Sequence, residues 1–336
     1  MKLAVIGAGY WGINLVRVFR QLDALHRICD FSPLRLETLR QLYPDIRLGN
    51  SIDEVVDDPS IDGIVIATPA DTHYGIASKA LLAGKDVFCE KPLTLHCGEA
   101  QELTELAARL QRILMVGHLL EYHPAITRLQ ELIEQGELGR LEYIYSNRLN
   151  LGKVRREENA LWSFAPHDIS VILLLLKQMP IQVSATGGTY LQPNIPDVTV
   201  STMLFDRGVR AHLFVSWLHP YKEQKLVVVG ERRMAVFDDV RKSEKLQLYE
   251  KKIELIDGQF VAEKPIPQPV AFSPDEPLLL ECRHFLDCMQ TRHSPKTDGA
   301  DAWRVLKVLE ASQRSLSMNG EPVQLEPHRS LEVVDA

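Results

Sequence analysis

Short apolar runs alternate with longer amphipathic stretches along the first 118 residues. The run over residues 62–69 is rich in β-branched apolar residues, which is typical of a strand buried on both sides of a parallel sheet. The runs are KLAVI (2–6), HRICD (26–30), DGIVIATP (62–69), DVFCEKP (86–92) and ILMVGH (113–118). The amphipathic stretches between them, such as 73–85 and 98–111, are expected to be helices. Strand alternating with helix predicts an α/β fold, with a doubly wound parallel sheet and right-handed crossovers.

The pattern changes after Gly117. A helix over about residues 124–135 leads into LEYIYSNRL (141–149), which alternates apolar and polar positions over a longer stretch than the earlier strands. Further strand-like segments follow with short turns between them: VTVSTMLF (198–205), VRAHLFVSW (209–217), KLVVVG (225–230), MAVFD (234–238) and LQLYE (246–250). This order predicts an α+β second domain with a large, mostly antiparallel open sheet, followed by helix over about 277–318.

A chain of 336 residues is longer than one ordinary hydrophobic core supports, so two domains are expected. The change of pattern assigns residues 1–118 to the first domain and 119–336 to the second. With 45% hydrophobic and 25% charged residues, the composition is that of a globular protein. The formal net charge of −7 gives no general attraction to nucleic acid or to an anionic membrane. An anionic ligand must therefore meet a local positive site.

Five scattered cysteines are few and odd in number, which favours reduced thiols over a disulfide framework. The first residues show no cationic region followed by a signal-type apolar core. Together these features predict a cytoplasmic protein. The histidines at 118, 123 and 167, with Cys89, raise the possibility of zinc, but their spacing matches no standard zinc cluster, so no metal is expected.

The string Gly7-Ala8-Gly9-Tyr10-Trp11-Gly12 follows the first predicted strand and precedes an amphipathic helix. In this context a G-x-G-x-x-G string indicates a dinucleotide-binding turn. The first glycine permits the turn, the second lets a pyrophosphate approach the backbone, and the third lets helix and sheet pack closely. The helix N-terminus supplies the local positive potential that the overall charge lacks.

Asp30 follows the second predicted strand, eighteen residues after Gly12. A carboxylate at this place can accept hydrogen bonds from the adenosine ribose and would repel a 2′-phosphate. The sequence therefore favours NAD over NADP, although Arg35 on the next helix could reach such a phosphate.

Glu90-Lys91-Pro92 directly follows a predicted buried strand, and Ala67-Thr68-Pro69 ends the one before it. In a doubly wound sheet, ligands bind beyond the carboxyl ends of the strands, so both triplets are expected to face the nicotinamide half of a cofactor. Lys91 would then be a cation placed where a substrate hydroxyl loses its proton. The competing interpretation of the two charges is a solvated strand end.

Taken together, the glycine string, Ala67-Thr68-Pro69 with Thr72-His73, Glu90-Lys91-Pro92 and His167-Asp168 resemble the Gfo/Idh/MocA oxidoreductases. The resemblance spans nearly the whole chain and implies an N-terminal Rossmann domain, a C-terminal domain for substrate binding and oligomerisation, and a homo-oligomer, either dimer or tetramer. It implies that Lys91 and His167 handle the proton of the substrate hydroxyl. The cofactor-binding residues that we expect are Gly7, Gly9, Tyr10, Trp11, Gly12, Asp30, Thr68, Pro69, His73, Glu90 and Lys91.

Two segments, GHLLEYHPAI (117–126) and GKVRREENALWSFAPHDISVI (152–172), narrow the resemblance to the nucleotide-sugar 3-dehydrogenases. These enzymes oxidise C3 of UDP-N-acetylglucosamine, or of its uronic acid, so that an aminotransferase can install a 3-amino group. The resemblance favours the neutral sugar, as the first step toward a 2,3-diamino-sugar lipid A.

One departure from the family concerns His167. Many members carry an aspartate four residues before this histidine, where this chain has Ser163. Asp168 cannot easily replace it, because neighbouring residues on a helix point away from each other. Whether Lys91 or His167 takes the proton is therefore open, and a core or helix-capping histidine is the competing interpretation of His167.

Candidate substrate-binding residues lie in the segment before His167. Arg155 and Arg156 suit a diphosphate, although a solvated charged turn explains them nearly as well. Asn159 could hydrogen-bond sugar hydroxyls, and Trp162 could flank the sugar or nicotinamide ring or belong to the core. Alternatives at the level of function are an NADP-linked ketosugar reductase, an inositol-type or free-sugar dehydrogenase, and a non-catalytic dinucleotide sensor.

Overall fold

A computed structural model of the chain describes residues 1–152, 154–156 and 158–325. It divides into two compact units: Met1–Pro124 with Pro274–Lys307, and Ala125–Ser273 with the described residues from Val308 onward. None of the helices in the described ranges has both the length and the apolar character that a bilayer-spanning segment requires. All five cysteines are buried thiols.

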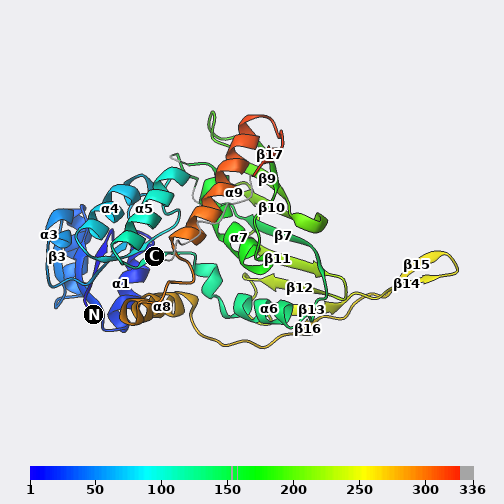
Figure 1. Cartoon of the computed structure of the whole chain (residues 1–336), viewed down its shortest axis with the longest axis horizontal. Helices are drawn as coiled ribbons and strands as arrows, with labels where there is room; N and C mark the ends of the chain where they lie inside the picture. The colour runs from blue at the N-terminus through cyan, green and yellow to red at the C-terminus, as the bar shows by residue number, and fades with distance from the viewer. Residues whose placement is uncertain (153, 157, 326–336) are drawn as a thin grey trace, which may run out of the picture. The chain divides into compact units, whose positions relative to one another are not determined.

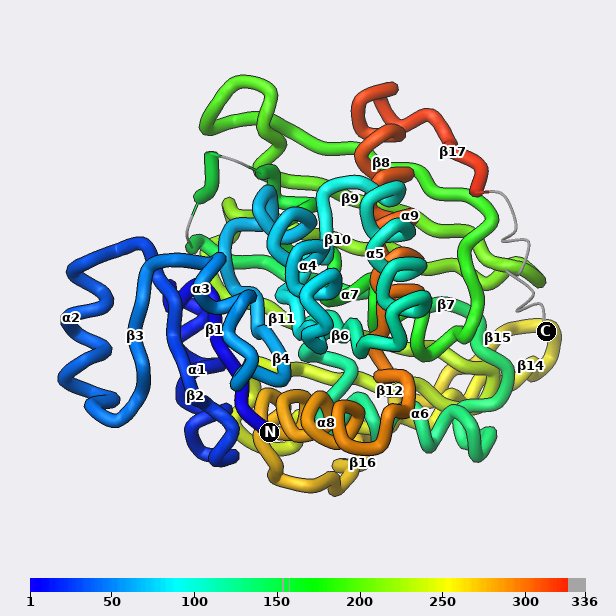
Figure 2. The backbone as a smooth tube through the Cα atoms, turned by 60° about the vertical axis from the view of Figure 1, so that its left-hand side comes forward, coloured from blue at the N-terminus to red at the C-terminus, as the bar shows by residue number. Residues whose placement is uncertain are grey.

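The first unit is built on a six-stranded sheet in which every pair is parallel, in the order β3-β2-β1-β4-β5-β6. The strands are β1 (Leu3–Ile6), β2 (Leu25–Cys29), β3 (Arg47–Gly49), β4 (Gly63–Ile66), β5 (Asp86–Cys89) and β6 (Leu114–Val116). Their crossovers are α1 (Gly12–Gln21), α2 (Pro33–Leu42), α3 (Ile52–Val56), α4 (His73–Leu82) and α5 (Cys97–Arg109). The predicted doubly wound parallel sheet is confirmed. Figure 2 shows α4 and α5 running side by side across it.

The sequence marks several of these boundaries locally. Ser32 caps α2, because its side chain accepts a hydrogen bond from the backbone of Arg35, and Pro33 occupies the first turn. Four strands, β1, β4, β5 and β6, are completely buried along their length, as continuous apolar runs predict. The order of the chain along the sheet reverses at β1 and β4, so their carboxyl ends form the crevice where such folds bind ligands.

The second unit contains a nine-stranded sheet in the order β16-β13-β12-β11-β7-β10-β9-β8-β17. Only the pair β7–β10 is parallel, so the expected mostly antiparallel sheet is confirmed. Its strands are β7 (Leu141–Leu149), β8 (Gln182–Gly188), β9 (Val198–Leu204), β10 (Arg210–Ser216), β11 (Glu223–Gly230), β12 (Arg233–Asp238), β13 (Leu246–Glu250), β16 (Gln268–Pro269) and β17 (Val323–Gln324). Helices α6 (Pro124–Glu134) and α7 (Ala160–Leu176) belong to this unit.

A separate hairpin, β14 (Ile253–Ile256) and β15 (Gln259–Ala262), extends from the end of β13. Figure 1 shows it projecting away from the nine-stranded sheet. Every residue of both strands is exposed, although most of them are apolar.

The units differ from the predicted 1–118 and 119–336 in two respects: the first stretch of unit one runs to Pro124, and a later segment returns to this unit. Helix α8 (Pro277–Thr291) and the first half of α9 (Gly299–Ser317) return to the first unit. The physical reason is a cluster of three edge-to-face rings, in which Phe285 of α8 lies 6.4 Å from Phe19 of α1 and 5.7 Å from Phe88 of β5. Figure 1 shows α8 beside α1 accordingly.

Removing the ring of Phe285 should therefore destabilise the dinucleotide-binding half of the protein. We expect Phe285→Ala to lower the free energy of unfolding of this unit by about 3–5 kcal/mol, because a fully buried ring leaves a cavity between helix and sheet. Urea denaturation measures the change, with Gln290→Ala on the exposed face of α8 as a control within about 0.5 kcal/mol of wild type. A loss below about 1 kcal/mol for Phe285→Ala would contradict this packing.

Candidate active site

The glycine turn is compressed to the point where two of its glycines are sterically required. A Cβ on Gly12 would lie 2.0 Å from the carbonyl oxygen of Gly7. Gly7 has a φ of +88°, and a Cβ there would lie 2.7 Å from the carbonyl oxygen of Ala67 at the end of β4. The turn therefore brings the N-terminus of α1 against the carboxyl ends of β1 and β4, as the glycine string predicts.

The turn also has the space and the charge that a dinucleotide needs. A Cβ on Gly9 would meet nothing closer than the Arg35 guanidinium at 4.0 Å, so the backbone is open to a close approach by a ligand. No side chain caps the N-terminus of α1, and Tyr10 beside it is 94% exposed. The backbone amides and dipole of α1 are thus available to a pyrophosphate. These residues fit a dinucleotide.

Asp30 links the turn to the end of β2. Its carboxylate accepts hydrogen bonds from the backbone of Ala8 (2.8 Å) and Ser32 (2.8 Å) and from the Arg35 guanidinium (2.9 and 3.1 Å). Burial alone would raise the pKa of Asp30, but these donors outweigh it and hold the pKa below its ordinary value. Asp30 is therefore a carboxylate at neutral pH, and it positions both the glycine turn and Arg35.

Glu90 is neither a solvated strand end nor an exposed rim residue. It follows β5 with 9% of its surface exposed, and its Oε1 accepts a hydrogen bond from the indole nitrogen of Trp11 at 2.5 Å. The backbone of Lys91 donates to Oε2 at 3.3 Å. Burial raises the pKa of Glu90 to about 7, against the opposing effects of Trp11 and Lys91. The pKa of Glu90 is therefore higher in the folded chain than in the unfolded chain, so folding is favoured while the carboxyl is protonated. This contribution to stability is lost as the pH rises through about 7.

Lys91 and Pro92 are joined by a cis peptide bond, and His73 fixes the loop that they begin. The buried His73 ring contacts the carbonyl oxygens of Pro92 (Nδ1, 2.8 Å) and Thr68 (Nε2, 2.9 Å). Burial lowers the pKa of His73, more than the two carbonyl contacts raise it, so the ring is neutral at pH 7. His73 thereby connects the loops after β4 and β5, and the structure gives it a positioning role.

Behind Glu90, the first unit contains a buried ion-pair network. Nδ1 of His118 lies 2.8 Å from a carboxylate oxygen of Asp301, whose other oxygen pairs with Arg304 at 3.1 Å.

His118, Glu121 and Asp301 bring three possible ligand atoms within 4.8 Å of one another. Lys296 and Arg304 already supply positive charge to these acids, so we assign them no metal. Burial raises the pKa of Cys89 well above 9, and zinc requires a thiolate.

In the second unit, His167 lies inside α7, one residue after Pro166, which excludes a helix-capping role. Asp168 points into the sheet, where its carboxylate binds Arg148 Nε (2.6 Å) and accepts a hydrogen bond from Ser146 Oγ (2.6 Å). Asp168 is thus engaged with β7 and does not orient His167, as neighbouring helix positions predict. These bonds determine which face of α7 lies against the sheet.

Asn159 and Trp162 have structural partners that the sequence does not indicate. Asn159 caps α7, because its Oδ1 accepts a hydrogen bond from the backbone of Trp162 (3.1 Å). Its Nδ2 donates to Gln313 of α9 (2.7 Å), and the indole of Trp162 donates to the same oxygen (3.2 Å). A sugar contact by Asn159 would compete with these bonds, whereas Trp162 keeps a partly exposed ring.

The charged segment before α7 forms local pairs. Nε of Arg155 lies 3.0 Å from Oε1 of Glu158. Both Arg155 and Arg156 are exposed. Lys153 and Glu157, which belong to the same predicted segment, lie outside the described residues. The two arginines remain predictions for diphosphate binding.

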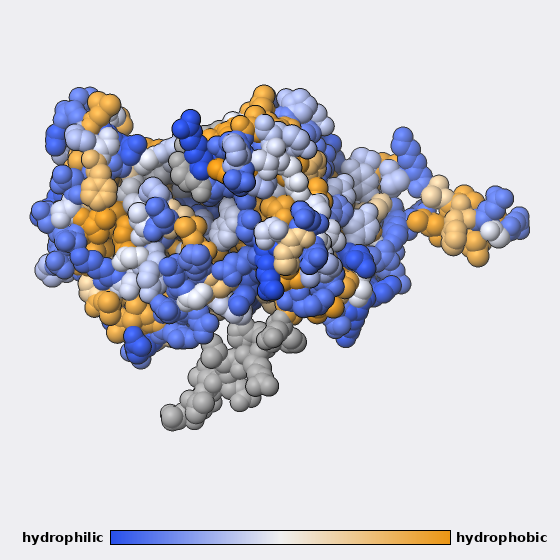
Figure 3. Space-filling model, turned by 90° about the horizontal axis from the view of Figure 1, so that it is seen from above, coloured by the Kyte–Doolittle hydropathy of each residue, from blue (hydrophilic) through white to orange (hydrophobic). Residues whose placement is uncertain are grey.

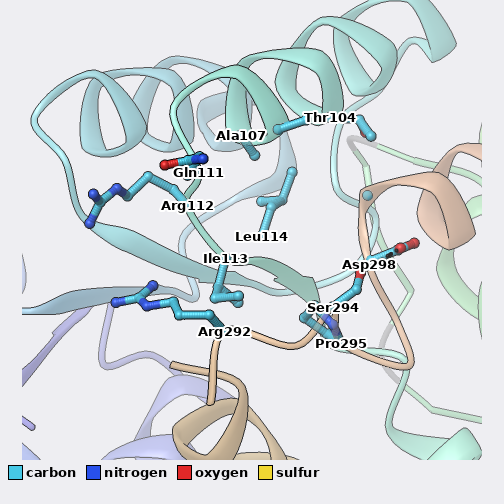
Figure 4. A pocket seen from close by; sticks show the side chains of 12 residues that line it. Thr104, Ala107, Gln111, Arg112, Ile113, Leu114, Arg292, Ser294, Pro295 and Asp298 are labelled. Carbon is cyan, nitrogen blue, oxygen red and sulfur yellow. Dashed lines mark hydrogen bonds between the residues drawn. The ribbon is translucent and has the colours of Figure 1, made fainter. Parts of the chain in front are cut away.

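A groove of about 660 Å³ in the first unit lies away from the strand ends described above. Figure 4 shows its walls, which come from α5, the start of β6 and the segment between α8 and α9, with Leu114, Arg112 and Arg292 among them. Arg292 is held there by Asp86 at the beginning of β5 (2.8 Å). The groove therefore flanks the amino ends of the strands, opposite the edge where this fold binds its cofactor.

Comparison with known proteins agrees with this geometry. Residues 1–118 match the sequence model of the oxidoreductase family with an NAD-binding Rossmann fold, Gfo/Idh/MocA, and residues 126–236 match a C-terminal domain of the same family. The chain belongs to the Gfo/Idh/MocA oxidoreductases. Its cofactor is NAD.

Among the relatives is UDP-N-acetylglucosamine 3-dehydrogenase of Acidithiobacillus ferrooxidans, which is 26% identical over 91% of this chain and 94% of its own length. Its solved structure matches with a TM-score of 0.83 at 24% identity, covering 95% of this chain and 98% of that one. The scyllo-inositol 2-dehydrogenase (NAD⁺) of Bacillus subtilis is also 26% identical, over 98% of each chain.

Other solved structures and other relatives are also similar to this chain. A levoglucosan dehydrogenase solved in complex with NADH matches with a TM-score of 0.83 at 20% identity, over 98% of this chain and all of that one. Another relative, 27% identical, is matched over only 53% of its length. These comparisons establish an oxidoreductase and its fold, and sugars and cyclitols are both represented among the relatives' substrates.

Two glycine substitutions should separate cofactor binding from folding. Gly9→Ala should fold normally, because its Cβ has open space, but it should weaken NAD binding at least about tenfold by occupying the place of the pyrophosphate. Gly12→Ala should lose both NAD binding and thermal stability, because its Cβ overlaps the Gly7 carbonyl. Fluorescence titration with NADH and thermal unfolding measure the two effects. Wild-type NAD affinity in Gly9→Ala would refute the assignment of the turn.

Proposed function

We propose that this chain oxidises the 3-hydroxyl of UDP-N-acetylglucosamine to a ketone with NAD, and so supplies the keto sugar for a 3-amino-sugar pathway such as that of 2,3-diamino-sugar lipid A. The observation that carries the proposal is the match, in sequence and in fold, to a UDP-N-acetylglucosamine 3-dehydrogenase over nearly the full length of both chains. The buried Glu90 and the Trp11 indole, which hold the Lys91 loop against the glycine turn, support an intact oxidoreductase site.

Proton transfer is assigned to Lys91 in the first unit and His167 in the second. Lys91 begins the loop after β5, at the strand edge where the glycine turn and α1 also lie. NAD bound there would supply the acceptor for the hydride that leaves the sugar carbon. A lysine beside the reacting carbon takes the hydroxyl proton and stabilises the developing alkoxide. Trp162 is proposed to flank the sugar, with Asn159 nearby, and Arg155 and Arg156 to bind the diphosphate.

A second candidate is an inositol-type dehydrogenase, because the scyllo-inositol 2-dehydrogenase matches this chain at the same identity and with higher coverage. A panel of UDP-N-acetylglucosamine, its uronic acid and scyllo-inositol, each with NAD and with NADP, distinguishes the candidates. The proposal expects kcat/KM to be highest for UDP-N-acetylglucosamine with NAD. Preference for scyllo-inositol would establish the second candidate, and strict use of NADP would fit a ketosugar reductase.

Substitution of the two proton-transfer residues tests the catalytic assignment. We expect Lys91→Met to lower kcat by about 10²- to 10⁴-fold, because general acid–base catalysis contributes this much, while NAD binding stays near wild type. His167→Asn should lower kcat as well, and the residue whose substitution abolishes the fall in rate at low pH is the general base. Unchanged turnover in Lys91→Met would favour a non-catalytic dinucleotide sensor.

The chain is also proposed to work as a homo-oligomer in the cytoplasm. The sheet face opposite α7 displays half-exposed apolar and aromatic residues, including Tyr143, Val200 and the stacked pair Tyr145–His212 (5.3 Å between ring centroids). The β14–β15 hairpin places Leu255 opposite Phe260 on one exposed face, and Figure 3 shows hydrophobic residues gathered along it. A two-stranded hairpin with such a face needs a covering surface to be stable.

Polar substitution of the hairpin face tests this assembly. In the double variant Leu255→Ser, Phe260→Ser we expect a smaller particle than wild type in light scattering or sedimentation, with unchanged secondary structure, because both side chains are exposed within the chain. Gln259→Ser on the opposite face of the hairpin is the matched control. A wild-type protein that is monomeric at micromolar concentration would contradict the proposal.

A further inference from the structure

Apart from Asp30 and Asp86, which pair with Arg35 and Arg292, four carboxyl groups are buried in the first unit, in four different parts of the chain. Glu90 follows β5, Glu121 lies in the short 3₁₀ segment Leu119–Tyr122, Glu281 lies on α8 and Asp301 on α9. A buried carboxylate is strongly destabilising unless it is paired or protonated. The partners of each group therefore show what the cluster does.

Three of the four have partners that account for their burial. Asp301 is bound by His118 and Arg304, and Glu90 accepts the Trp11 indole. Glu121 shares a hydrogen bond with Asp301 and is stabilised by the charge of Lys296. Lys296 in turn donates to the backbone carbonyl of Glu121 at 2.6 Å.

Glu281 is the exception. It is 0% exposed, and neither of its carboxyl oxygens has a hydrogen-bond partner among the residues that the structure describes. The titratable groups that face it are Glu90 after β5, Glu121 and Tyr122 in the 3₁₀ segment, and Cys282 beside it on α8. None of these is a cation, so Glu281 is stable only with its proton bound, and burial raises its pKa well above the ordinary value.

Packing alone does not explain an acid at this position. The neighbours of Glu281 on α8, Leu278, Cys282 and Phe285, are part of the apolar core that also contains Phe88. A leucine or methionine would cost nothing in desolvation there, whereas a carboxyl group without a described partner does. Unlike a leucine, a protonated carboxyl at this position can carry a proton between the two acids that face it, Glu90 and Glu121.

We propose that Glu281 is a proton-relay residue, which passes the proton released at Lys91 from Glu90 to the Glu121–Asp301 pair and so to solvent beside Arg304. This role rests on the proposed function, because alcohol oxidation supplies the proton. The half-exposed side chain of Arg304 marks the outer end of the route, and Lys91, whose backbone contacts Glu90, marks the inner end.

The transfers balance without another reactant. The substrate O–H bond breaks and its proton joins the amine of Lys91. An N–H bond of Lys91 then breaks as the proton joins ionised Glu90. Glu121 gives its proton to Asp301 and receives that of Glu281, Glu281 receives that of Glu90, directly or through internal water, and Asp301 releases the proton it received to solvent. Glu90 can both accept and release a proton near neutrality, since its pKa is about 7.

Glu281→Gln tests the relay, because the amide keeps the shape of the protonated carboxyl but cannot pass a proton on in this way. NADH absorbance and a pH-indicator dye, followed together in stopped flow, report hydride transfer and proton release. In wild type the two traces should coincide. In Glu281→Gln, proton release and kcat should fall about 10- to 100-fold, with a larger solvent deuterium isotope effect on kcat and unchanged NAD affinity.

Two further variants make the outcome decisive. Glu281→Leu should show the same kinetic loss while folding at least as stably as wild type, since it removes a buried polar group. Asp287→Asn, on the exposed face of α8, should behave as wild type. A wild-type rate, pH profile and proton release in Glu281→Gln or Glu281→Leu would overturn the relay.

An infrared measurement keeps this test separate from the proposed function. The infrared difference spectrum between wild type and Glu281→Gln at pH 7 should contain the C=O stretch of a protonated, buried Glu281 carboxyl, whether or not the enzyme turns over. Absence of that band would overturn the relay by showing an ionised Glu281. If the band is present and no alcohol yields NADH, the proposed function fails, and the relay falls with it for lack of a proton to carry.

Discussion

The hydrogen bond between the Trp11 indole and the buried Glu90 is the contact on which the arrangement of the site depends. It joins the glycine turn after β1 to the end of β5, across the carboxyl end of β4 that lies between them in the sheet. Because Glu90 is buried, its position is fixed by partners rather than by solvent. The direction in which the chain leaves β5, and with it the place of Lys91, follows from this bond and from the hydrogen bond of the Lys91 backbone to Glu90.

Two other contacts complete the same edge. His73 binds the loops after β4 and β5 to each other, and Asp30 binds the glycine turn to the end of β2. Both groups are buried and held by several contacts to different loops, which restricts the movement of this edge before any ligand arrives. The chain therefore presents a preorganised surface for NAD, in keeping with its membership of the Gfo/Idh/MocA oxidoreductases.

Much of the first unit could be predicted because its signals are local. The glycine string, Asp30 and the apolar strands each specify backbone geometry through neighbouring residues, and the structure confirms the sheet that they predict. Glu90 was ambiguous in the sequence, because a charged residue after a strand has the same appearance whether it is solvated or buried. Its burial depends on Trp11, which lies 79 residues away.

The return of α8 to the first unit and the role of Gln313 could not be predicted for a similar reason. Phe285 packs with Phe19 and Phe88, and Gln313 binds Asn159 across 154 residues, so no local pattern indicates either contact. Substrate identity is harder still, since it depends on individual side chains at the site rather than on the fold.

The most direct test of the account is a crystal structure of the protein with NAD and UDP-N-acetylglucosamine. The account predicts that C3 of the sugar lies within about 3.5 Å of nicotinamide C4, and that Lys91 Nζ is within hydrogen-bond reach of the 3-hydroxyl. A sugar ring bound with another carbon facing the nicotinamide, or a Lys91 side chain directed away from the reacting carbon, would contradict it.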